Sequence, residues 1–263
     1  MNSSDEPQAA SRIDRFFGGR FHLHQPLGRG FRAGLDAMLL AACVPGGARG
    51  ECADIGAGTG AVGFGAAVRA PELAVTLVEK DAAAVERLTA SVGDPANEGF
   101  ASRLTVAHTD ILARRRTREA AGLHDGRFDL VLTNPPFFPG DHRRSPDAAR
   151  DAALFAPEPD FLRRWLRASA ALVAPRGGLV LVARPADLPV VIEALDRRLG
   201  ALTVLPVHTR PGAALRILVG ARAGSREGLS ILPGLDLHGP GSEATAKAIA
   251  DGAFDIGIVA RRP

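Results

Sequence analysis

Short apolar runs alternate with longer amphipathic stretches along most of the chain. The apolar runs have the length of buried strands. Between them lie Ala-, Leu- and Arg-rich stretches with helical spacing, and strands that alternate with helices in this way form a parallel sheet covered by crossover helices. Two later runs, separated by Pro211-Gly212, predict an antiparallel pair at the edge of that sheet. The predicted strands cover 52–55, 73–79, 104–107, 128–133, 179–183, 201–205 and 215–221, and the clearest helices cover 161–173 and 188–199.

The chain has 263 residues, of which 46% are of hydrophobic types, so it can bury one α/β core without a second domain. No internal repeat is evident. We therefore expect a single domain flanked by tails. The predicted divisions are a flexible tail at 1–15, a domain at 16–250 and a second tail at 251–263, with the domain comprising a flanking segment at 16–50, a Rossmann-like core at 51–223 and an extension at 224–250.

A glycine-rich segment follows the first of these strands. Residues 53–60 read Ala-Asp-Ile-Gly-Ala-Gly-Thr-Gly and lead into an Ala/Val/Phe-rich stretch that predicts a helix. Gly56, Gly58 and Gly60 let the backbone pass close to a ligand, and the start of the following helix can bind a carboxylate or phosphate. The segment therefore predicts a nucleotide-type cofactor loop.

Two acidic residues bear on which cofactor this loop binds. Glu79 ends the next apolar run, nineteen residues past Gly60, where a carboxylate can accept hydrogen bonds from the two ribose hydroxyls. The loop also fits the relaxed G-x-G-x-x-G/A pattern of NAD sites, so by itself it leaves both a dinucleotide and S-adenosylmethionine open. Asp54 stands just before the first glycine, where its charge would repel a pyrophosphate but suits an ammonium and a sulfonium. Its position favours S-adenosylmethionine.

A second motif, Asn134-Pro135-Pro136-Phe137, directly follows the strand predicted at 128–133. The prolines fix φ at two successive positions and remove two backbone donors, so the turn presents hydrogen-bond acceptors. The Asn134 side-chain oxygen and the Pro135 carbonyl can take both hydrogens of a planar NH2 group, while Phe137 offers a face for stacking. Accepting both hydrogens draws the nitrogen lone pair out of conjugation and makes the amine a better nucleophile. A plain Pro-Pro loop is the alternative for the motif taken alone.

With these motifs in this order, the chain resembles class I S-adenosylmethionine-dependent methyltransferases whose fourth strand ends in N-P-P-aromatic. The resemblance implies a Rossmann-like fold with a mostly parallel seven-stranded sheet, an antiparallel edge pair and helices on both faces. It also implies S-adenosylmethionine as the cofactor. The matching segments are 54–60, 78–81, 109–111 and 134–137.

The resemblance extends to the bacterial family that methylates N6 of an adenine in the anticodon loop of valine tRNA. Segments 21–45, 216–220 and 235–250 are similar to that family outside the general cofactor motifs. It implies that Asp110 lies beside the cofactor's adenine amine and that Asp36 lies near the cofactor. From the residues alone, Asp36 precedes an apolar helical run and could equally cap that helix.

One position departs from that family, which commonly has Tyr where this chain has Phe137. The chain contains no tyrosine. Phenylalanine keeps the stacking face and loses the hydroxyl. Related ribosomal-RNA guanine-N2 methyltransferases resemble this chain in having N-P-P-F, so the identity of the base stays open.

The net charge is +3, and all but two of the 32 basic residues are arginine, which favours bidentate phosphate contacts. Arg143 and Arg144 follow the catalytic turn closely, where they could hold phosphates around an extruded nucleotide or could equally be solvated surface. A second cluster at 114–118 is better explained as a solvated loop. Trp165 has helical spacing with neighbouring apolar residues and is expected in the core.

Other patterns exclude several classes of protein. Cys43 and Cys52 stand in apolar surroundings typical of buried reduced thiols, and the scattered histidines indicate no metal site. Residues 1–12 are polar and no apolar run approaches membrane-spanning length, so we expect a cytoplasmic protein without a membrane partner. The sequence predicts no oligomeric state.

These observations predict an S-adenosylmethionine-dependent N-methyltransferase that acts on the exocyclic amine of a nucleobase in RNA, foremost N6 of adenine in tRNA. Transfer to N2 of guanine in rRNA is the nearest alternative. A glutamine amide in a release factor fits the same turn, but those enzymes usually carry an N-terminal helical domain for which about fifty residues leave no room. A non-catalytic cofactor-binding RNA scaffold and an NAD-dependent oxidoreductase rank lower, because neither needs the turn at 134–137.

Overall fold

A mostly parallel sheet forms the centre of the protein in the computed structural model, which describes residues 11–27, 34–136, 138–139, 155–156 and 160–258. The order of the strands is β12-β10-β11-β9-β6-β3-β4-β5, and β13 also pairs with β10. The strands from β9 to β5 are parallel, whereas β11 is antiparallel to β9 and β10. The bounds are β3 Arg49–Ile55, β4 Glu72–Glu79, β5 Leu104–His108, β6 Phe128–Thr133, β9 Val173–Ala183, β10 Leu199–His208, β11 Arg216–Ala223, β12 Ser230–Ile231 and β13 Leu235–Asp236.

All seven predicted strands are therefore confirmed, together with the antiparallel pair at the edge. Within the described ranges the sheet has nine strands rather than seven, because two strands of two residues each, β12 and β13, add to β10 beyond the predicted edge. Both lie in the segment that was expected only as an extension. Two further strands of two residues each, β7 (Phe138–Pro139) and β8 (Phe155–Ala156), pair only with each other and form a separate sheet.

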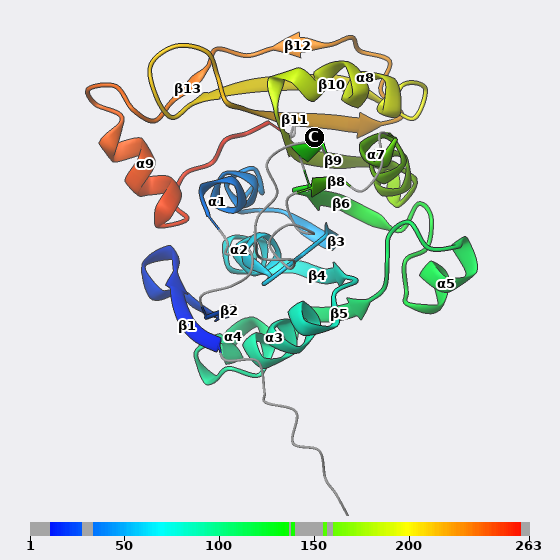
Figure 1. Cartoon of the computed structure of the whole chain (residues 1–263), viewed down its shortest axis with the longest axis vertical. Coiled ribbons are helices and arrows are strands. Elements are labelled where there is room, and N and C mark those ends of the chain that lie inside the picture. Colours follow the sequence, from blue (N-terminus) through cyan, green and yellow to red (C-terminus); the bar gives the residue numbers. More distant parts are fainter. Residues whose placement is uncertain (1–10, 28–33, 137, 140–154, 157–159, 259–263) are drawn as a thin grey trace, which may run out of the picture.

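Helices cover both faces of the sheet, as predicted. Right-handed crossovers place α2, between β3 and β4, on one face and α7, between β6 and β9, on the other. Figure 1 shows α1 and α2 side by side on one side of the strands and α7 on the opposite side. The helices are α1 Leu35–Ala42, α2 Ala61–Arg69, α3 Ala82–Val92, α4 Glu98–Ala101, α5 Arg115–Ala120, α7 Phe161–Ala171, α8 Leu188–Leu195 and α9 Glu243–Ala250, with short 3-10 turns at Phe17–Gly19, Pro95–Asn97 and Pro185–Asp187.

An N-terminal hairpin of β1 (Ser11–Phe16) and β2 (Phe21–Pro26) lies next to α3 and α4 (Figure 1). It is held there by backbone-to-side-chain hydrogen bonds, because the His22 N–H donates to Asn97 Oδ1 and the His24 N–H donates to Ser91 Oγ, each at 2.9 Å. The predicted tail at 1–15 was therefore wrong for its last residues, since 11–15 belong to the first strand of this hairpin. This strand pairs with β2, which packs on the core through the buried side chains of Phe21 and Leu23.

The segment after α9 also packs on the core. The Ile256 N–H donates to the Ala42 carbonyl at 2.9 Å, and Arg69 Nη1 donates to the Gly252 carbonyl at 2.6 Å. Ile258 is buried beside Gly220, where a methyl group on the glycine would lie 2.9 Å from the Ile258 carbonyl oxygen. The prediction of a tail over 251–263 was therefore wrong for residues 251–258.

The apolar core extends along both faces of the sheet, and it contains the two cysteines. Cys43 and Cys52 are fully buried and free, as predicted, and burial raises the pKa of each thiol well above its usual value. Within the described ranges, no helix combines the length and apolarity needed to cross a membrane. Across the same residues, no group of three or more His, Cys, Asp or Glu side chains is arranged to hold a metal ion.

Candidate active site

The carboxyl ends of four neighbouring parallel strands bring the sequence motifs together. The glycine loop follows β3, Glu79 ends β4, Asp110 follows β5 and Asn134 follows β6. The strand registers place these ends level with one another, because Ile55 is opposite both Val78 and Thr133. Ligands of open α/β sheets bind at this edge. The structure therefore assembles four motifs that lie far apart in the sequence.

The glycine loop has the backbone that its sequence predicts. Gly56, Gly58 and Gly60 have φ values of +74°, +56° and +93°, a region that side chains other than glycine rarely adopt. A methyl group on Gly60 would lie 2.6 Å from Leu88 Cδ2, so this glycine is required for packing. Gly58 differs, since among the described residues no atom beyond Gly58 and its two chain neighbours lies within 4 Å of the position its Cβ would take. The backbone at Gly58 therefore borders open space, which fits close approach of a cofactor.

Glu79 contacts this loop directly. Its Oε2 accepts a hydrogen bond from the Gly58 N–H at 2.9 Å, and its Oε1 accepts from the backbone N–H groups of Lys80 and Asp81 at 2.8 Å each. A carboxylate offers about four lone-pair directions, two on each oxygen, so Oε2 retains capacity for one further donor. The acid and the glycine loop are therefore in direct contact at the carboxyl ends of β3 and β4.

Asp54 lies behind the loop rather than on its open face. Its side chain is 1% exposed, and its Oδ2 accepts from the Gly63 N–H, in the first turn of α2, at 2.9 Å. Burial raises the pKa of Asp54 from 3.8 to about 7; the hydrogen bond from Gly63 opposes this change, and the nearby charge of Glu79 adds to it. Asp54 therefore fixes the start of α2 and is poised to change its charge near neutral pH.

Asn134 begins the catalytic turn. It is half-buried, and its Oδ1 is shielded from solvent without a hydrogen-bond partner among the described residues. Pro135 is buried and Pro136 is partly buried. A buried amide oxygen without a donor is costly and uncommon, so this atom fits an acceptor that awaits a ligand. Phe137 lies outside the described residues.

Asp36 and Asp110 have different surroundings. Asp36 lies inside the first turn of α1, whose N-cap is Gly34, and accepts from Arg216 Nε of β11 at 2.9 Å, so it does not occupy the N-cap position. Asp110 accepts from the Leu112 N–H at 2.8 Å and lies 4.0 Å from Lys80 Nζ, with 40% of its side chain exposed. Asp110 is thus open to a ligand at the end of β5.

Two residues that the sequence motifs missed join the glycine loop to the catalytic turn. The Thr133 hydroxyl, at the end of β6, donates to the Ile55 carbonyl at 2.9 Å and accepts from Trp165 Nε1 at 2.8 Å. Trp165 lies in the core, as predicted, at 6% exposure and with its ring 5.4 Å from that of Phe161. A threonine directly after the apolar run Leu130–Leu132 was the available signal for this contact.

Comparison with known proteins decides the family. The family model for the methyltransferase small domain matches residues 33–205 of this chain. The chain belongs to this family. It is similar to the tRNA1(Val) (adenine(37)-N6)-methyltransferases of two Porphyromonas gingivalis strains, each 33% identical, over 70% and 75% of this chain and 68% and 73% of the relatives. These matches confirm the prediction of an S-adenosylmethionine-dependent N-methyltransferase with a Rossmann-like fold.

Solved structures agree with this assignment. One described as a predicted O-methyltransferase from Agrobacterium tumefaciens is 32% identical, with a TM-score of 0.70, over 84% of this chain and 97% of that one. A Thermus thermophilus 16S rRNA N2 G1207 methyltransferase, solved with S-adenosylmethionine and guanosine, shares the fold at 23% identity and a TM-score of 0.55, over 81% of this chain and 50% of that one. The methyltransferase thus has the expected fold and uses the expected cofactor.

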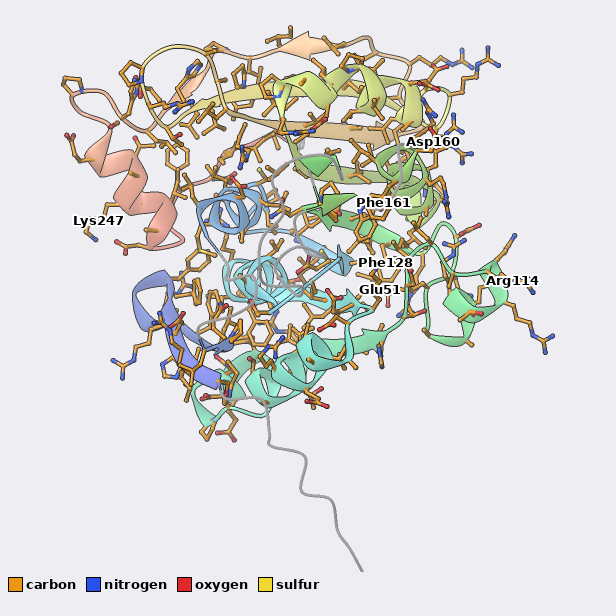
Figure 2. The ribbon with its side chains drawn as sticks, in the orientation of Figure 1. Glu51, Arg114, Phe128, Asp160, Phe161 and Lys247 are labelled. Carbon is orange, nitrogen blue, oxygen red and sulfur yellow. The ribbon has the colours of Figure 1, made fainter. Side chains whose placement is uncertain are left out.

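The predicted arginine contacts of the methyltransferase are only partly described. Arg143 and Arg144 lie outside the described residues. In the second cluster, Arg115 pairs with Glu119 at 2.7 Å and Arg118 lies 3.6 Å from Asp125. Arg114 points outward from the molecule beside α5 (Figure 2). Partial neutralisation and an outward position both agree with a solvated surface.

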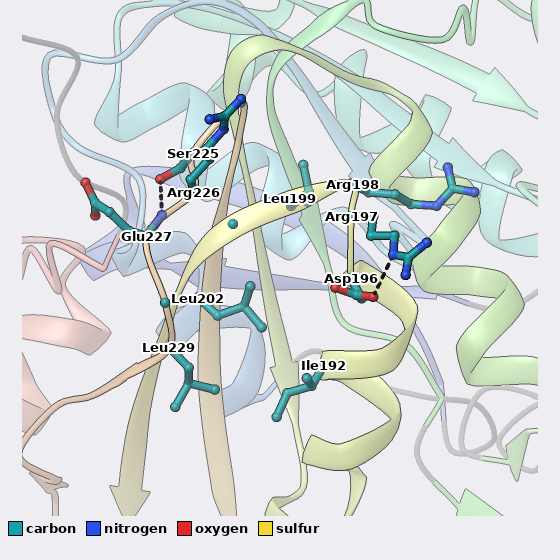
Figure 3. A pocket seen from close by; sticks show the side chains of 13 residues that line it. Ile192, Asp196, Arg197, Arg198, Leu199, Leu202, Ser225, Arg226, Glu227 and Leu229 are labelled. Carbon is teal, nitrogen blue, oxygen red and sulfur yellow. Dashed lines mark hydrogen bonds and ion pairs between the residues drawn. The ribbon is translucent and has the colours of Figure 1, made fainter.

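A pocket of about 590 Å³ lies away from these motifs, between α8, the start of β10 and the loop at 224–229 (Figure 3). Strand β10 is antiparallel to β11, which is antiparallel to β9, so the start of β10 lies at the end of the sheet opposite the catalytic turn. Of the predicted site residues that the structure describes, none lines this pocket. It is therefore separate from the methyltransferase site.

Proposed function

We propose that this methyltransferase acts on the exocyclic amine of a nucleobase in RNA, foremost on N6 of an adenine in tRNA. The observation that carries the proposal is the buried Asn134 Oδ1, which has no donor among the described residues. An exocyclic NH2 supplies such a donor, and the Pro135 carbonyl is the adjacent acceptor for its second hydrogen. A planar amine can donate one hydrogen to Asn134 Oδ1 and the other to the Pro135 carbonyl oxygen.

The described residues also fit the cofactor. S-adenosylmethionine supplies an electrophilic methyl group on a sulfonium. Gly58 borders open space, Glu79 Oε2 has a lone pair for a ribose hydroxyl and Asp110 is exposed where it can accept from an adenine amine. Asp54 is buried, so we assign it an indirect part, in which it fixes the start of α2 and contributes charge behind the loop. Asp36 stays a proposed neighbour of the cofactor that is oriented by Arg216.

The chain contributes positioning and polarity rather than a strong base. Asn134 and Pro135 align the amine so that its lone pair points away from the ring system, which raises its nucleophilicity. Correct alignment of two reactants can supply most of the rate of such a transfer. The proton leaves after transfer, when the methylated nitrogen is acidic, so solvent or a weak acceptor suffices. Phe137, by sequence, and the pair Arg143 and Arg144 remain proposals for base stacking and phosphate contact.

The names of the relatives support RNA over protein as the substrate. The matches named tRNA1(Val) (adenine(37)-N6)-methyltransferase extend over up to 75% of this chain. A ribosomal protein uL3 glutamine methyltransferase of Bradyrhizobium diazoefficiens matches 48% of this chain and 38% of its own length at 30% identity. A ribosomal RNA small subunit methyltransferase C of Pectobacterium atrosepticum matches 35% and 22% at 34% identity. The wider matches therefore favour adenine in tRNA.

The test measures transfer of labelled methyl from S-adenosylmethionine to bacterial tRNA, to rRNA and to a release factor, followed by nucleoside or peptide analysis. We expect N6-methyladenosine in tRNA, lost in Asn134→Ala. The control variant is Arg197→Ala, because Arg197 is 92% exposed and lines the pocket at the opposite end of the sheet. If the product is N2-methylguanosine in rRNA or methylglutamine in the release factor, then guanine or glutamine is the substrate in place of adenine. Cofactor binding without methylation of any of the three would contradict the proposal.

A further inference from the structure

Trp165 contacts both halves of the active site from beneath. Its Nε1–H donates to Thr133 Oγ1 at 2.8 Å, and the Thr133 hydroxyl donates to the Ile55 carbonyl at 2.9 Å. All three residues are buried. Because a hydroxyl has one hydrogen to donate, the Thr133 hydrogen is committed to Ile55 and its oxygen to Trp165. The result is a directed chain of two hydrogen bonds, which we name the Trp165–Thr133–Ile55 chain.

The same indole packs against the first glycine of the cofactor loop. A methyl group on Gly56 would lie 2.9 Å from Trp165 Cζ2 and 3.0 Å from Cη2, distances that real side chains do not reach. The six-membered ring therefore lies directly against the backbone at Gly56, where φ is +74°. One rigid side chain thus supports Gly56 through packing and Thr133 through a hydrogen bond.

The positions of these contacts give them their importance. Ile55 and Thr133 are partners in the register of β3 and β6, at the ends of both strands. The residue after Ile55 is Gly56, which opens the cofactor loop, and the residue after Thr133 is Asn134, which opens the catalytic turn. A shift of one strand end relative to the other would move the amine acceptor relative to the cofactor loop.

We propose that Trp165 and Thr133 are positioning residues that set the distance and orientation between the cofactor loop and the catalytic turn. This inference rests on the proposed function of both. A hydrophobic pair of similar volume would fill the same core space, so packing alone does not call for a polar pair here. The hydrogen bonds define one relative arrangement of two strand ends, and alignment errors of about 1 Å can lower the rate of a transfer by about a hundredfold.

Thr133→Val tests the proposal, because valine keeps the shape and removes the hydroxyl. We expect kcat to fall by about tenfold to a hundredfold and the affinity for S-adenosylhomocysteine to fall by roughly fivefold. Thr133→Ser restores the hydroxyl and should return both values to near those of the unaltered protein. The matched control is Ser169→Ala, which removes another buried hydroxyl that bonds to the Trp165 carbonyl at 2.9 Å on the same helix.

A purely structural role predicts a different pattern. In that case Thr133→Val and Ser169→Ala would lower the melting temperature and leave the kcat and KM of the folded protein unchanged. Equal kcat values in these two variants, measured well below both melting temperatures, would overturn the proposal. Failure of Thr133→Ser to restore activity would do the same.

The indole provides a direct signal, because Trp165 is the single tryptophan of the chain. Binding of S-adenosylhomocysteine at the loop above Gly56 should change the intensity or wavelength of Trp165 emission, in step with occupancy measured by calorimetry. Unchanged emission at a filled site would contradict the contact between the indole and the cofactor loop. Trp165→Phe, which keeps a ring and removes the N–H, should lower kcat as Thr133→Val does.

The emission and affinity measurements need no RNA substrate. If the unaltered protein methylates none of the tested acceptors, the proposed function fails, while the emission change and the weaker binding of Thr133→Val still decide the proposal about positioning. If the protein methylates RNA and Thr133→Val matches Ser169→Ala in every measurement, only the positioning proposal fails.

Discussion

Removal of the buried charge at Asp54 should change how stability depends on pH. Asp54→Asn keeps the shape of the side chain, and the amide oxygen can still accept from the Gly63 N–H that Asp54 Oδ2 now meets at 2.9 Å. The asparagine does not titrate. The difference in stability between the two proteins therefore isolates the titration of this one carboxyl group.

The structure gives the size of the effect. The pKa of Asp54 rises from 3.8 to about 7, chiefly through burial. A tenfold change in an ionisation constant corresponds to about 1.4 kcal/mol. Because the pKa of Asp54 is higher in the folded protein, the folded state binds more protons than the unfolded state between pH 4 and 7. The contribution of this group to stability is therefore fully present below pH 4 and is lost as pH rises through 7. Its total loss is about 4 kcal/mol, of which about 3 kcal/mol falls between pH 5 and 8.

The assay is urea unfolding of both proteins at several values between pH 5 and 8, without cofactor. We expect the free energy of unfolding of the unaltered protein to fall relative to that of Asp54→Asn by about 3 kcal/mol over this interval. The control is Glu72→Gln, which alters an exposed side chain on the neighbouring strand. The difference in free energy of unfolding between the unaltered protein and Glu72→Gln should stay constant over the same interval. Parallel curves for the unaltered protein and Asp54→Asn would refute the assigned pKa.

Three further changes test separate parts of the site. Asn134→Ala should lower kcat by on the order of a hundredfold or more without lowering the melting temperature, since it removes a buried oxygen with no donor among the described residues; a matching loss of stability in thermal unfolding would contradict this. Glu79→Gln should weaken S-adenosylmethionine binding in calorimetry by at least tenfold, whereas Glu72→Gln should not; equal affinities would exclude Glu79 from the cofactor site. Gly60→Ala should destabilise the protein by about 1–3 kcal/mol, because Gly60 has a φ of +93° and contacts the core. Gly58→Ala should destabilise the protein less than Gly60→Ala and weaken cofactor binding more. If chemical unfolding and calorimetry rank the two alanine variants the other way, Gly58 does not border the cofactor.

The sequence predicted the seven longer strands and the meeting of four motifs, and both for the same reason. Strand ends in a parallel sheet lie at one edge, so Gly58, Glu79, Asp110 and Asn134 had to meet once the strands were assigned. Local glycine and proline chemistry then specified the two turns. Hydrophobic periodicity and turn chemistry depend on a few neighbouring residues, and the seven strands and the two turns could be predicted from such local patterns alone.

Contacts between distant segments escaped prediction. The ion pair of Asp36 with Arg216 joins α1 to β11, and no pattern near either residue announces it. Asp54 was expected to face the cofactor because its charge suited the ligand, but helix α2 needed an acceptor for Gly63 and the core enclosed the carboxyl group. The role of Thr133 depended on where α7 carries Trp165, which periodicity does not show.

The segment at 252–258 has a consequence for how the protein is made. It contributes hydrogen bonds to Ala42 and Arg69 and places Ile258 against β11, although it is synthesised long after α1 and α2. Contacts between residues so distant in sequence form late and slow the approach to the native state. During translation, Ala42 of α1 and Arg69 of α2 therefore lack these hydrogen-bond partners until nearly the whole of the described chain has been made. That interval is when a chaperone or a premature association would have its greatest effect on yield.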